Sequence, residues 1–425
     1  MESILPALSA VDSVLWGPPL IILLIGTGIF LTIRLKLLQV LRLPLALRLI
    51  FKAKNQGKGD VSSFKALCVA LAATVGTGNI VGVATAVKVG GPGAIFWMWI
   101  AAFFGMATKY AEGLLAVKYR SVDANGEIAG GPMFYIRNGL GEKWKPLAVF
   151  FAIACILVAF LGIGTFPQVN AIVDSMAITF AFPRVATDVI LTVFIAAVTI
   201  GGLQSISKVA SKLIPFMALF YIAISLGLIV LFIDRLPSAI ALILDGAFTG
   251  TAAAGGFAGS TIMIAMQNGI ARGVFSNESG LGSAPIAAAA AKTKWPAEQG
   301  LISMTGTFID TIIICTMTGL ALVLTGVWQG DAAGAAMTTA AFASIYGSVG
   351  SQLLTISLIL FAFTTILGWN YYGERAVIYL TGTKGVLPYR LIFIVLIASG
   401  AFLKLEAIWV PTSSTASWQF QTSSP

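Results

Sequence analysis

A polar, glycine-rich patch interrupts an apolar stretch that is long enough to cross a lipid bilayer. The stretch covers residues 64–88, and the patch reads Ala73-Thr-Val-Gly-Thr-Gly-Asn-Ile80. Inside hydrocarbon every backbone N–H and C=O needs a hydrogen-bond partner, so irregular backbone survives there only where it lines a cavity or a site. Because Gly76 and Gly78 weaken the helix, the sequence predicts a helix that is broken at membrane depth to form a binding site.

The broken turn predicts a site for a small acid and a small cation. Opening one turn exposes free amides at the N-terminus of one half-helix and free carbonyls at the C-terminus of the other. Amides attract a carboxylate, and carbonyls attract a cation. We expect the N–H groups of Thr77 and Gly78 to bind a substrate carboxylate, assisted by the Asn79 side chain. The alternative is close helix packing, which Gly-x-Gly pairs also favour.

The whole chain has the composition of an integral membrane protein. It is 58% hydrophobic and 10% charged over 425 residues, whereas soluble domains contain about 25% charged residues. Hydropathy predicts about eleven spans of roughly 20 residues each. Their expected limits are 17–35, 64–88, 93–117, 147–172, 186–203, 211–233, 249–271, 301–325, 351–372, 389–403 and a last span from about 405. Histidine is absent, which excludes His-ligated metals and His-based triads, and we expect neither an enzyme nor a cofactor.

Lys and Arg gather in alternate segments between these spans. If Arg34–Lys65 is cytoplasmic, only four of the 26 basic residues fall on the other side; the other segments on the cytoplasmic side are 118–146, 204–212, 272–300 and 373–390. The positive-inside rule then places the N-terminus outside the plasma membrane, and the net charge of +9 requires no nucleic-acid partner. Regularly spaced leucines in the first half of Arg34–Lys65 favour a helix that lies on the membrane surface.

The spans after the first divide into two units of five. An odd number of spans per unit makes the second unit enter the membrane from the opposite side, which defines an inverted repeat. We expect an extra N-terminal helix with a basic linker at 1–62, a first repeat at 63–233 and a second repeat at 234–425. The second repeat opens with glycines and then Met266-Gln-Asn-Gly-Ile270. It therefore predicts a second helix break there, opposite the first; the glycines are Gly250, Gly255, Gly256 and Gly259.

Two further spans carry polar side chains that fit the same site. In Phe363-Thr-Thr-Ile-Leu-Gly-Trp-Asn370, Thr365 and Trp369 share a helix face, and the hydroxyls of Thr364 and Thr365 suit sodium. The alternatives are threonines that bond to their own helix and a tryptophan that anchors at the interface. Gln168 is a candidate contact for the substrate or, equally, one partner of a plain helix–helix hydrogen bond.

Asp310 is the ionisable residue that lies deepest in an apolar run, Thr307-Phe-Ile-Asp-Thr-Ile-Ile-Ile. A carboxylate at membrane depth indicates a function by default. Attraction of an ion, a proton site and a structural acceptor for neighbouring hydroxyl and amide groups all remain open, and direct coordination of an ion is the least favoured.

These motifs resemble those of the alanine/glycine:cation symporter family. The likeness reaches to about Trp409 and rests on the first patch together with Gly90-Gly-Pro-Gly, Ala129-Gly-Gly-Pro-Met, the segment 271–285 and Phe308-Ile-Asp-Thr. It implies an all-α membrane protein with the five-plus-five inverted repeat of the leucine-transporter fold and one extra N-terminal helix. It further implies sodium-coupled symport of alanine, glycine or both, by alternating access.

The resemblance also implies which residues bind each ligand. For the substrate, it points to Thr77, Gly78 and Asn79 and to the break at Gln267 to Ile270. With the candidates from the residue patterns above, the expected substrate set is Thr77, Gly78, Asn79, Gln168, Gln267, Asn268, Ile270, Thr365 and Trp369. The sodium set is the carbonyls of Ala72 and Val75 with the hydroxyls of Thr364 and Thr365. A proton-coupled transporter of other small neutral amino acids and an ion channel are the rival readings, and the sequence leaves the oligomeric state open.

Residues 410–425 depart from this family, because they are polar where a last span is expected. Reading the codons in a shifted frame can give a string that resembles the final segment of the family. We therefore expect that a frameshift altered residues 410–425 and truncated the last span.

Overall fold

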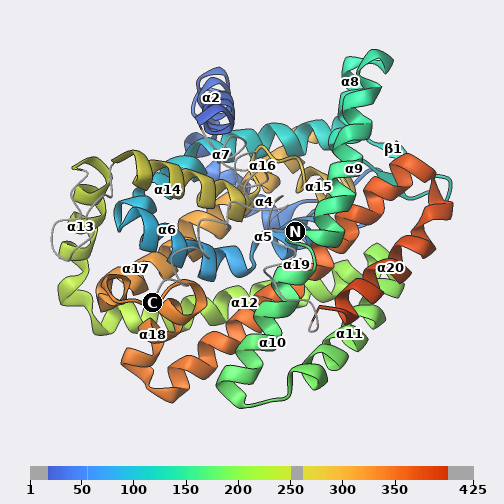
Figure 1. The fold of residues 1–425 in the computed structure, drawn as a ribbon. Helices are drawn as coiled ribbons and strands as arrows, with labels where there is room; N and C mark the ends of the chain where they lie inside the picture. The colour runs from blue at the N-terminus through green and yellow to red at the C-terminus, as the bar shows by residue number, and fades with distance from the viewer. Residues whose placement is uncertain (1–17, 55, 250–261, 401–425) are drawn as a thin grey trace, which may run out of the picture.

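The computed structural model describes residues 18–54, 56–249 and 262–400, and helices dominate this part of the chain (Figure 1). The first half contains α2 (Pro18–Arg34), α3 (Leu38–Leu41), α4 (Leu43–Lys52), α5 (Ser63–Thr74), η1 (Gly78–Gly82), α6 (Val83–Gly90), α7 (Gly93–Lys118), β1 (Ser121–Val122), β2 (Ile128–Ala129), α8 (Pro132–Leu140), η2 (Glu142–Trp144), α9 (Lys145–Leu161), α10 (Phe166–Phe180), α11 (Arg184–Ile200) and α12 (Gly202–Leu231).

The second half is also helical. It contains η3 (Ile233–Arg235), α13 (Leu236–Phe248), α14 (Ile262–Asn277), α15 (Pro285–Ala289), α16 (Pro296–Thr307), η4 (Phe308–Cys315), α17 (Thr316–Thr325), η5 (Val327–Gln329), α18 (Gly334–Tyr346), α19 (Ser348–Thr381), η6 (Thr383–Gly385) and α20 (Val386–Ala398). The segments η1 and η4 are π-helical, whereas η2, η3, η5 and η6 are short 3-10 turns.

Several helices of the described chain are long and apolar enough to cross a membrane. Five qualify alone, and the bent pair Ser63–Thr74 with Gly78–Gly90 makes a sixth. The five are Gly93–Lys118, Glu142–Phe180, Gly202–Leu231, Pro296–Thr325 and Ser348–Thr381. These lengths confirm a multi-pass, all-α membrane protein, while the count of eleven spans and the division into two repeats stay predictions. The last predicted span and the tail 410–425, for which we expect a frameshift, lie outside the described residues.

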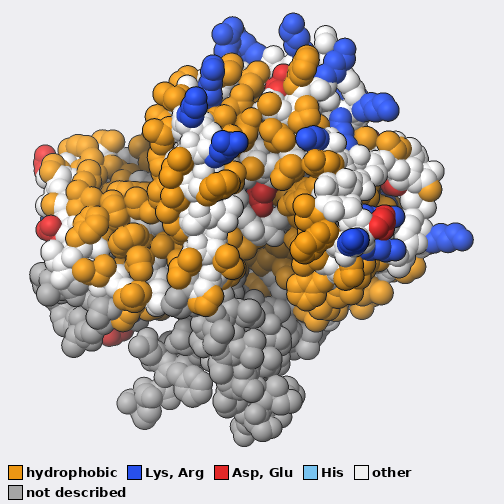
Figure 2. Space-filling model, turned by 90° about the horizontal axis from the view of Figure 1, so that it is seen from above, with side chains coloured by type: hydrophobic (Ala, Val, Ile, Leu, Met, Phe, Trp, Pro, Cys, Tyr) orange, Lys and Arg blue, Asp and Glu red, His pale blue; other side chains and the backbone are white. Residues whose placement is uncertain are grey.

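The outer faces of the helices are apolar, as a bilayer requires. Phe150, Val193 and Leu219 are each at least 60% exposed. Figure 2 shows hydrophobic side chains over much of one face, with Lys and Arg side chains standing among them.

The predicted span 147–172 lies inside the single candidate span Glu142–Phe180, which contains a junction between two helices. α9 ends at Leu161 and α10 begins at Phe166, with Pro167 in the first turn of α10. Proline fits a first turn because its missing N–H has no helical partner there, and Gly162 and Gly164 supply the connection. This junction brings Gln168 close to the start of α10, where it faces the first helix break.

Candidate functional site

The first helix break is confirmed at the predicted place. α5 ends at Thr74, the helix resumes at Gly78, and the two halves meet at an angle of 52°. In a continuous helix the Gly76 N–H would bond the Ala72 carbonyl. It donates to Asn79 Oδ1 instead, at 2.8 Å. The Ala72 carbonyl therefore loses its helical donor at the end of α5.

Asn79 fastens the break to η4, a segment more than 200 residues away. Its Nδ2 donates to Asp310 Oδ1 at 2.8 Å and to the Asp310 carbonyl at 3.2 Å. Its own carbonyl accepts a hydrogen bond from Thr318 Oγ1 at 2.7 Å. Asn79 is fully buried. Because both ends of its amide are engaged within the protein, the geometry supports a positioning role, and direct contact with substrate stays a prediction.

Asp310 is the centre of a buried polar network. Its Oδ2 accepts hydrogen bonds from Ser276 Oγ at 2.9 Å and from Thr311 Oγ1 at 2.8 Å. Thr311 in turn accepts a hydrogen bond from Asn277 Nδ2 at 3.0 Å. Three separate segments, η1, η4 and the end of α14, thus meet at one carboxylate. π-helical turns of this kind are frequent at functional sites.

The prediction of a helix break at Gln267 to Ile270 is wrong. α14 runs without interruption from Ile262 to Asn277, and Asn268 Nδ2 donates to the Ile264 carbonyl one turn back. Gly269 packs against α7, where a Cβ would collide with the Ala94 carbonyl oxygen. The glycine therefore serves close helix packing. The glycine-rich stretch at 250–261 lies outside the described residues.

One residue of the predicted second break, Ile270, packs apart from the first break. Ile270 packs in a cluster with Ile21, Ala101 and Val274, separate from the large core that surrounds the first break. Ser276 of α14 does lie beside the break, since a Cβ on Gly78 would be 3.6 Å from the Ser276 Cα. Substrate binding by Gln267, Asn268 and Ile270 stays a prediction.

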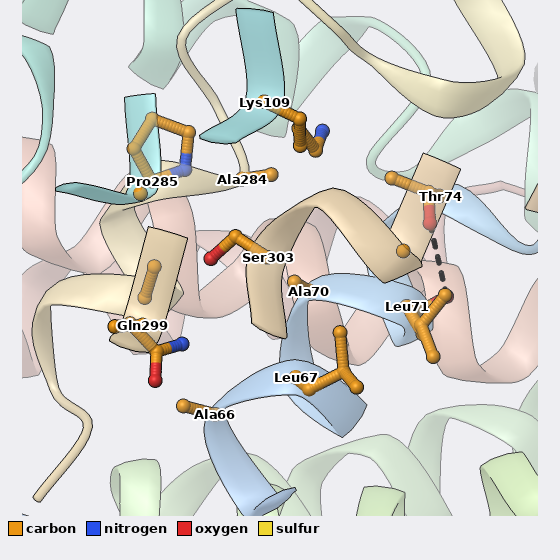
Figure 3. A pocket seen from close by; sticks show the side chains of 13 residues that line it. Ala66, Leu67, Ala70, Leu71, Thr74, Lys109, Ala284, Pro285, Gln299 and Ser303 are labelled. Atoms are coloured by element: carbon orange, nitrogen blue, oxygen red, sulfur yellow. Dashed lines mark hydrogen bonds between the residues drawn. The ribbon is translucent and has the colours of Figure 1, made fainter. Parts of the chain in front are cut away.

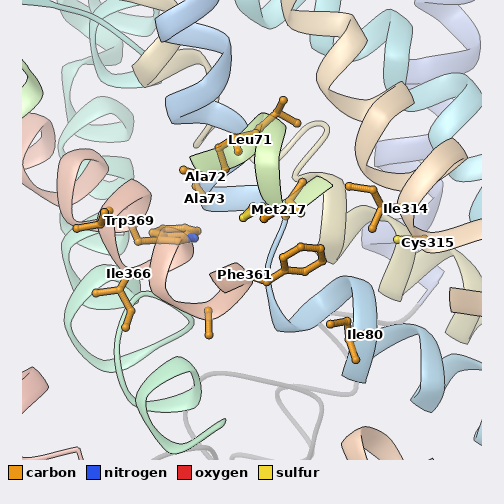
Figure 4. Close-up of a cluster of buried hydrophobic side chains, with 14 of the residues drawn as sticks. Leu71, Ala72, Ala73, Ile80, Met217, Ile314, Cys315, Phe361, Ile366 and Trp369 are labelled. Carbon is orange, nitrogen blue, oxygen red and sulfur yellow. The ribbon is translucent and has the colours of Figure 1, made fainter. Parts of the chain in front are cut away.

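α19 faces the first break through the predicted residues. A Cβ on Gly76 would overlap Thr365 Oγ1, and a Cβ on Gly368 would lie 2.6 Å from the Ala73 amide nitrogen. Figure 4 shows Ile366 and Trp369 at the left, Ile314 and Cys315 at the right, and Phe361 between them. The structure therefore brings Thr365 and the break together.

The two threonine hydroxyls bond to their own helix in this conformation. Thr364 Oγ1 and Thr365 Oγ1 each donate to the Phe361 carbonyl at 3.0 Å. Thr364 Oγ1 also lies 3.5 Å from Met217 Sδ on α12. A hydroxyl that donates in this way keeps its lone pairs, so Thr365 can still offer an oxygen to a cation beside Gly76.

Gln168 contacts the break, as expected. Its Nε2 donates to Thr77 Oγ1 at 3.1 Å, while its Oε1 is buried without a hydrogen-bond partner in the described structure. Trp369 Nε1 is likewise buried and unpaired among the described residues. Most buried polar atoms are paired. The binding of substrate by Gln168 and Trp369 stays a prediction, and these two unpaired atoms are consistent with it.

A narrow pocket runs along α5 from the break toward α15 and α16 (Figure 3). Its lining is mostly small or apolar, with Thr74 at one end and Gln299 at the other. Both polar atoms of the Gln299 side chain are buried and unpaired within the described structure. Nothing in the sequence around Gln299 signalled this pocket.

Comparisons with known proteins show which family and which fold this chain resembles. The sequence profile described as the sodium:alanine symporter family matches residues 1–415. The sodium/alanine symporter AgcS of Methanococcus maripaludis is 50% identical to this chain, over 94% of this chain and 89% of its own length. An uncharacterised transporter of Haemophilus influenzae is 59% identical, over 96% and 89%. The solved structure of MhsT in complex with L-phenylalanine, at 12% identity and a TM-score of 0.56, covers 81% of this chain and 80% of MhsT, and shows a shared fold.

Proposed function

Because this chain belongs to the sodium:alanine symporter family, we propose that it carries alanine, glycine or both across the plasma membrane together with sodium. The observation that carries the proposal is the opened turn between α5 and η1. There the Gly76 amide donates its hydrogen bond to Asn79 and not to the Ala72 carbonyl. Alternating access would expose this turn to each side in succession. The proposal includes an outside N-terminus and the two inverted repeats at 63–233 and 234–425.

The substrate would lie between the break and the unpaired atoms of α10 and α19. The N–H groups of Thr77 and Gly78 would bind its carboxylate. Gln168 Oε1 could accept a hydrogen bond from its ammonium group, and Trp369 would close the pocket. A pocket closed by an indole excludes large side chains by overlap, whereas unfilled space costs only about 1–3 kcal/mol. This arrangement favours alanine and glycine over larger amino acids.

Sodium would lie at the end of α5, among oxygen atoms. The carbonyls of Ala72 and Val75 and the hydroxyl of Thr365 form the candidate set, and Thr364 would complete it. The loss of the Gly76 donor from Ala72 and the closeness of Thr365 to Gly76 support this set. Sodium and substrate would thus share one opened turn.

Uptake into proteoliposomes tests the proposal. We would impose a sodium gradient and a pH gradient separately and measure uptake of radiolabelled alanine and glycine. We expect saturable uptake that follows the sodium gradient. Uptake that follows only the pH gradient would show that protons, and not sodium, are the coupling ion. Flux that does not saturate with substrate would indicate a channel.

A matched pair of variants tests the ion site. Thr365→Val removes the hydroxyl beside the break, and Thr339→Val removes a hydroxyl on α18 that likewise bonds to its own helix, at 2.9 Å. We expect Thr365→Val to raise the sodium concentration needed for half-maximal uptake by about tenfold or more, with Thr339→Val unchanged. Equal sodium dependence in both variants would reject Thr365 as a ligand.

A further inference from the structure

The segment 38–52, which we name the interfacial segment, combines exposed basic and exposed apolar side chains. Leu41 and Phe51 are 70% and 80% exposed. Arg42, Arg48 and Lys52 are also exposed on α4 and its N-cap. Leu45, Arg48 and Lys52 follow each other at steps of three and four residues, so they share one face of α4. A face of this composition suits the boundary between lipid headgroups and acyl chains.

The charge around this segment has one sign. Residues 13–59 contain no Asp or Glu, whereas they contain seven basic residues, Arg34, Lys36, Arg42, Arg48, Lys52, Lys54 and Lys58. None of the ion pairs in the described chain involves these seven side chains. The unmatched positive charge is complementary to an anionic surface, and each basic residue near such a surface adds to the attraction.

The opposite face of the segment is buried against the helix that leads to Asp310. Ala46 packs in one cluster with Met106 and Tyr110 of α7 and Met304 of α16, and Phe308 borders that cluster. α16 continues directly into η4, which begins at Phe308. The interfacial segment is thus joined through packed side chains to the π-helical turn that holds Asp310.

We propose that the interfacial segment binds the headgroups of anionic phospholipids in the cytoplasmic leaflet, and that this binding holds α4 against α16 during transport. The leaflet assignment rests on the topology in the proposed function. The apolar side chains Leu41 and Phe51 enter the acyl boundary, while Arg42, Arg48 and Lys52 contact phosphate. Loss of the lipid loosens the packing of α4 against α16. Because α16 continues into η4, the Asp310 network is then held less firmly and the transport rate falls.

Two variants of equal charge test this proposal. Arg42→Gln/Arg48→Gln/Lys52→Gln removes three charges from the interfacial segment. Lys208→Gln/Lys212→Gln/Lys384→Gln removes three charges elsewhere on the same predicted side. Alanine uptake is measured in vesicles of phosphatidylcholine alone and of phosphatidylcholine with phosphatidylglycerol. We expect phosphatidylglycerol to raise the rate of the unmodified protein and of the control by about fivefold, and to leave the interfacial variant unaffected.

A second measurement does not depend on transport. The midpoint of thermal unfolding in detergent is followed as phosphatidylglycerol is added, and we expect it to rise for the unmodified protein and the control only. A rise in all three proteins, or in none, overturns the proposal. If the unmodified protein shows the rise in midpoint but no sodium-driven uptake in any lipid, the proposed function fails and the lipid site stands.

Discussion

At the scale of single residues, the absence of a side chain at Gly76 decides how closely α19 approaches the broken helix. Thr365 Oγ1 occupies the position where a Cβ on Gly76 would stand. A β-branched threonine has few rotamers to move into, and rotation would also break its bond to the Phe361 carbonyl. The contact therefore fixes the distance between the hydroxyl and the opened turn.

Gly76→Ala is predicted to separate these two elements. The added methyl group displaces Thr365, and we expect sodium-driven alanine uptake to fall by roughly tenfold or more. Gly82→Ala is the matched control, because a Cβ at position 82 would meet no atom of the described chain within 4 Å beyond the backbone of its own helix. Uptake kinetics of both purified variants provide the check. If the two variants transport equally well, the approach of Thr365 to the break has no role in transport.

The hydrogen bond between Asn79 and Asp310 predicts how uptake changes when one or both of these side chains are exchanged. Asn79→Asp alone places two carboxylates at the distance of a hydrogen bond, 2.8 Å, inside the protein. Like charges that close repel strongly where water is excluded. In Asn79→Asp/Asp310→Asn, the carboxylate introduced at position 79 would still accept from the Gly76 amide, and the amide introduced at position 310 would donate to it. We expect the single exchange to abolish uptake and the double exchange to restore part of it. A double variant no better than Asn79→Asp would show that the pair does not act as a unit.

The sequence predicted those residues of the site that stand out in a local sequence pattern. Thr77, Gly78 and Asn79 were recognisable as polar residues and a glycine in an apolar run, and the structure places Gln168 and Thr365 beside them. It missed Ser276, which donates to Asp310 across 34 positions of the sequence. The pairing depends on how α14 packs, which no local pattern encodes.

At the scale of elements, glycine has two uses in a membrane helix, and the sequence does not separate them. Near Gly76 the helix opens because an asparagine three residues on captures the free amide. Near Gly269 the glycine instead admits the backbone of α7. The first break was predictable because a polar partner accompanies the glycines. The break predicted at Gln267 to Ile270 is wrong, because Asn268 bonds within its own helix and the helix stays closed there.

A charge cluster ties the short hairpin of β1 and β2 to α19. Arg375 is buried on α19 and pairs with Glu127 at 2.8 Å, with Glu374 at 3.2 Å and with Asp123 at 3.5 Å. Glu374 also pairs with Arg390 of α20 at 2.6 Å. Because the hairpin follows α7 in the chain, this cluster joins α7 to α19 and α20.

Arg375→Met is predicted to destabilise the protein. It takes the guanidinium away from the buried carboxylate of Asp123 and keeps much of the volume of the side chain, so the loss is mainly electrostatic. Removing one partner of a buried ion pair costs about 3–5 kcal/mol, and we expect a lower midpoint of thermal unfolding in detergent. Arg137→Gln, which breaks an exposed pair with Glu142, should leave the midpoint unchanged. Equal midpoints for both variants would mean that the cluster does not hold α19.

At the scale of the whole molecule, distant parts of the chain converge on one opened turn. α5 and η1 come from the first hundred residues, η4 from beyond residue 300 and α19 from beyond residue 345. The proposed substrate lies on the η1 side of this turn and the proposed sodium on the α5 side. Whichever ligand binds first orders backbone that the other also needs, so the second ligand meets less of the ordering cost.

This shared turn predicts reciprocal coupling between sodium and alanine. Linkage requires that sodium raise the affinity for alanine by the same factor by which alanine raises the affinity for sodium, typically about 5–150-fold. Equilibrium binding of each ligand to purified protein, with and without the other, measures both factors. Thr365→Val should weaken sodium binding, and Gly82→Ala should leave both factors unchanged because it meets no neighbouring atom of the described chain. If neither ligand changes the affinity for the other, sodium and substrate bind to separate parts of the structure. Ligands that share one turn must be coupled, because the first ligand to bind already meets the cost of ordering that turn.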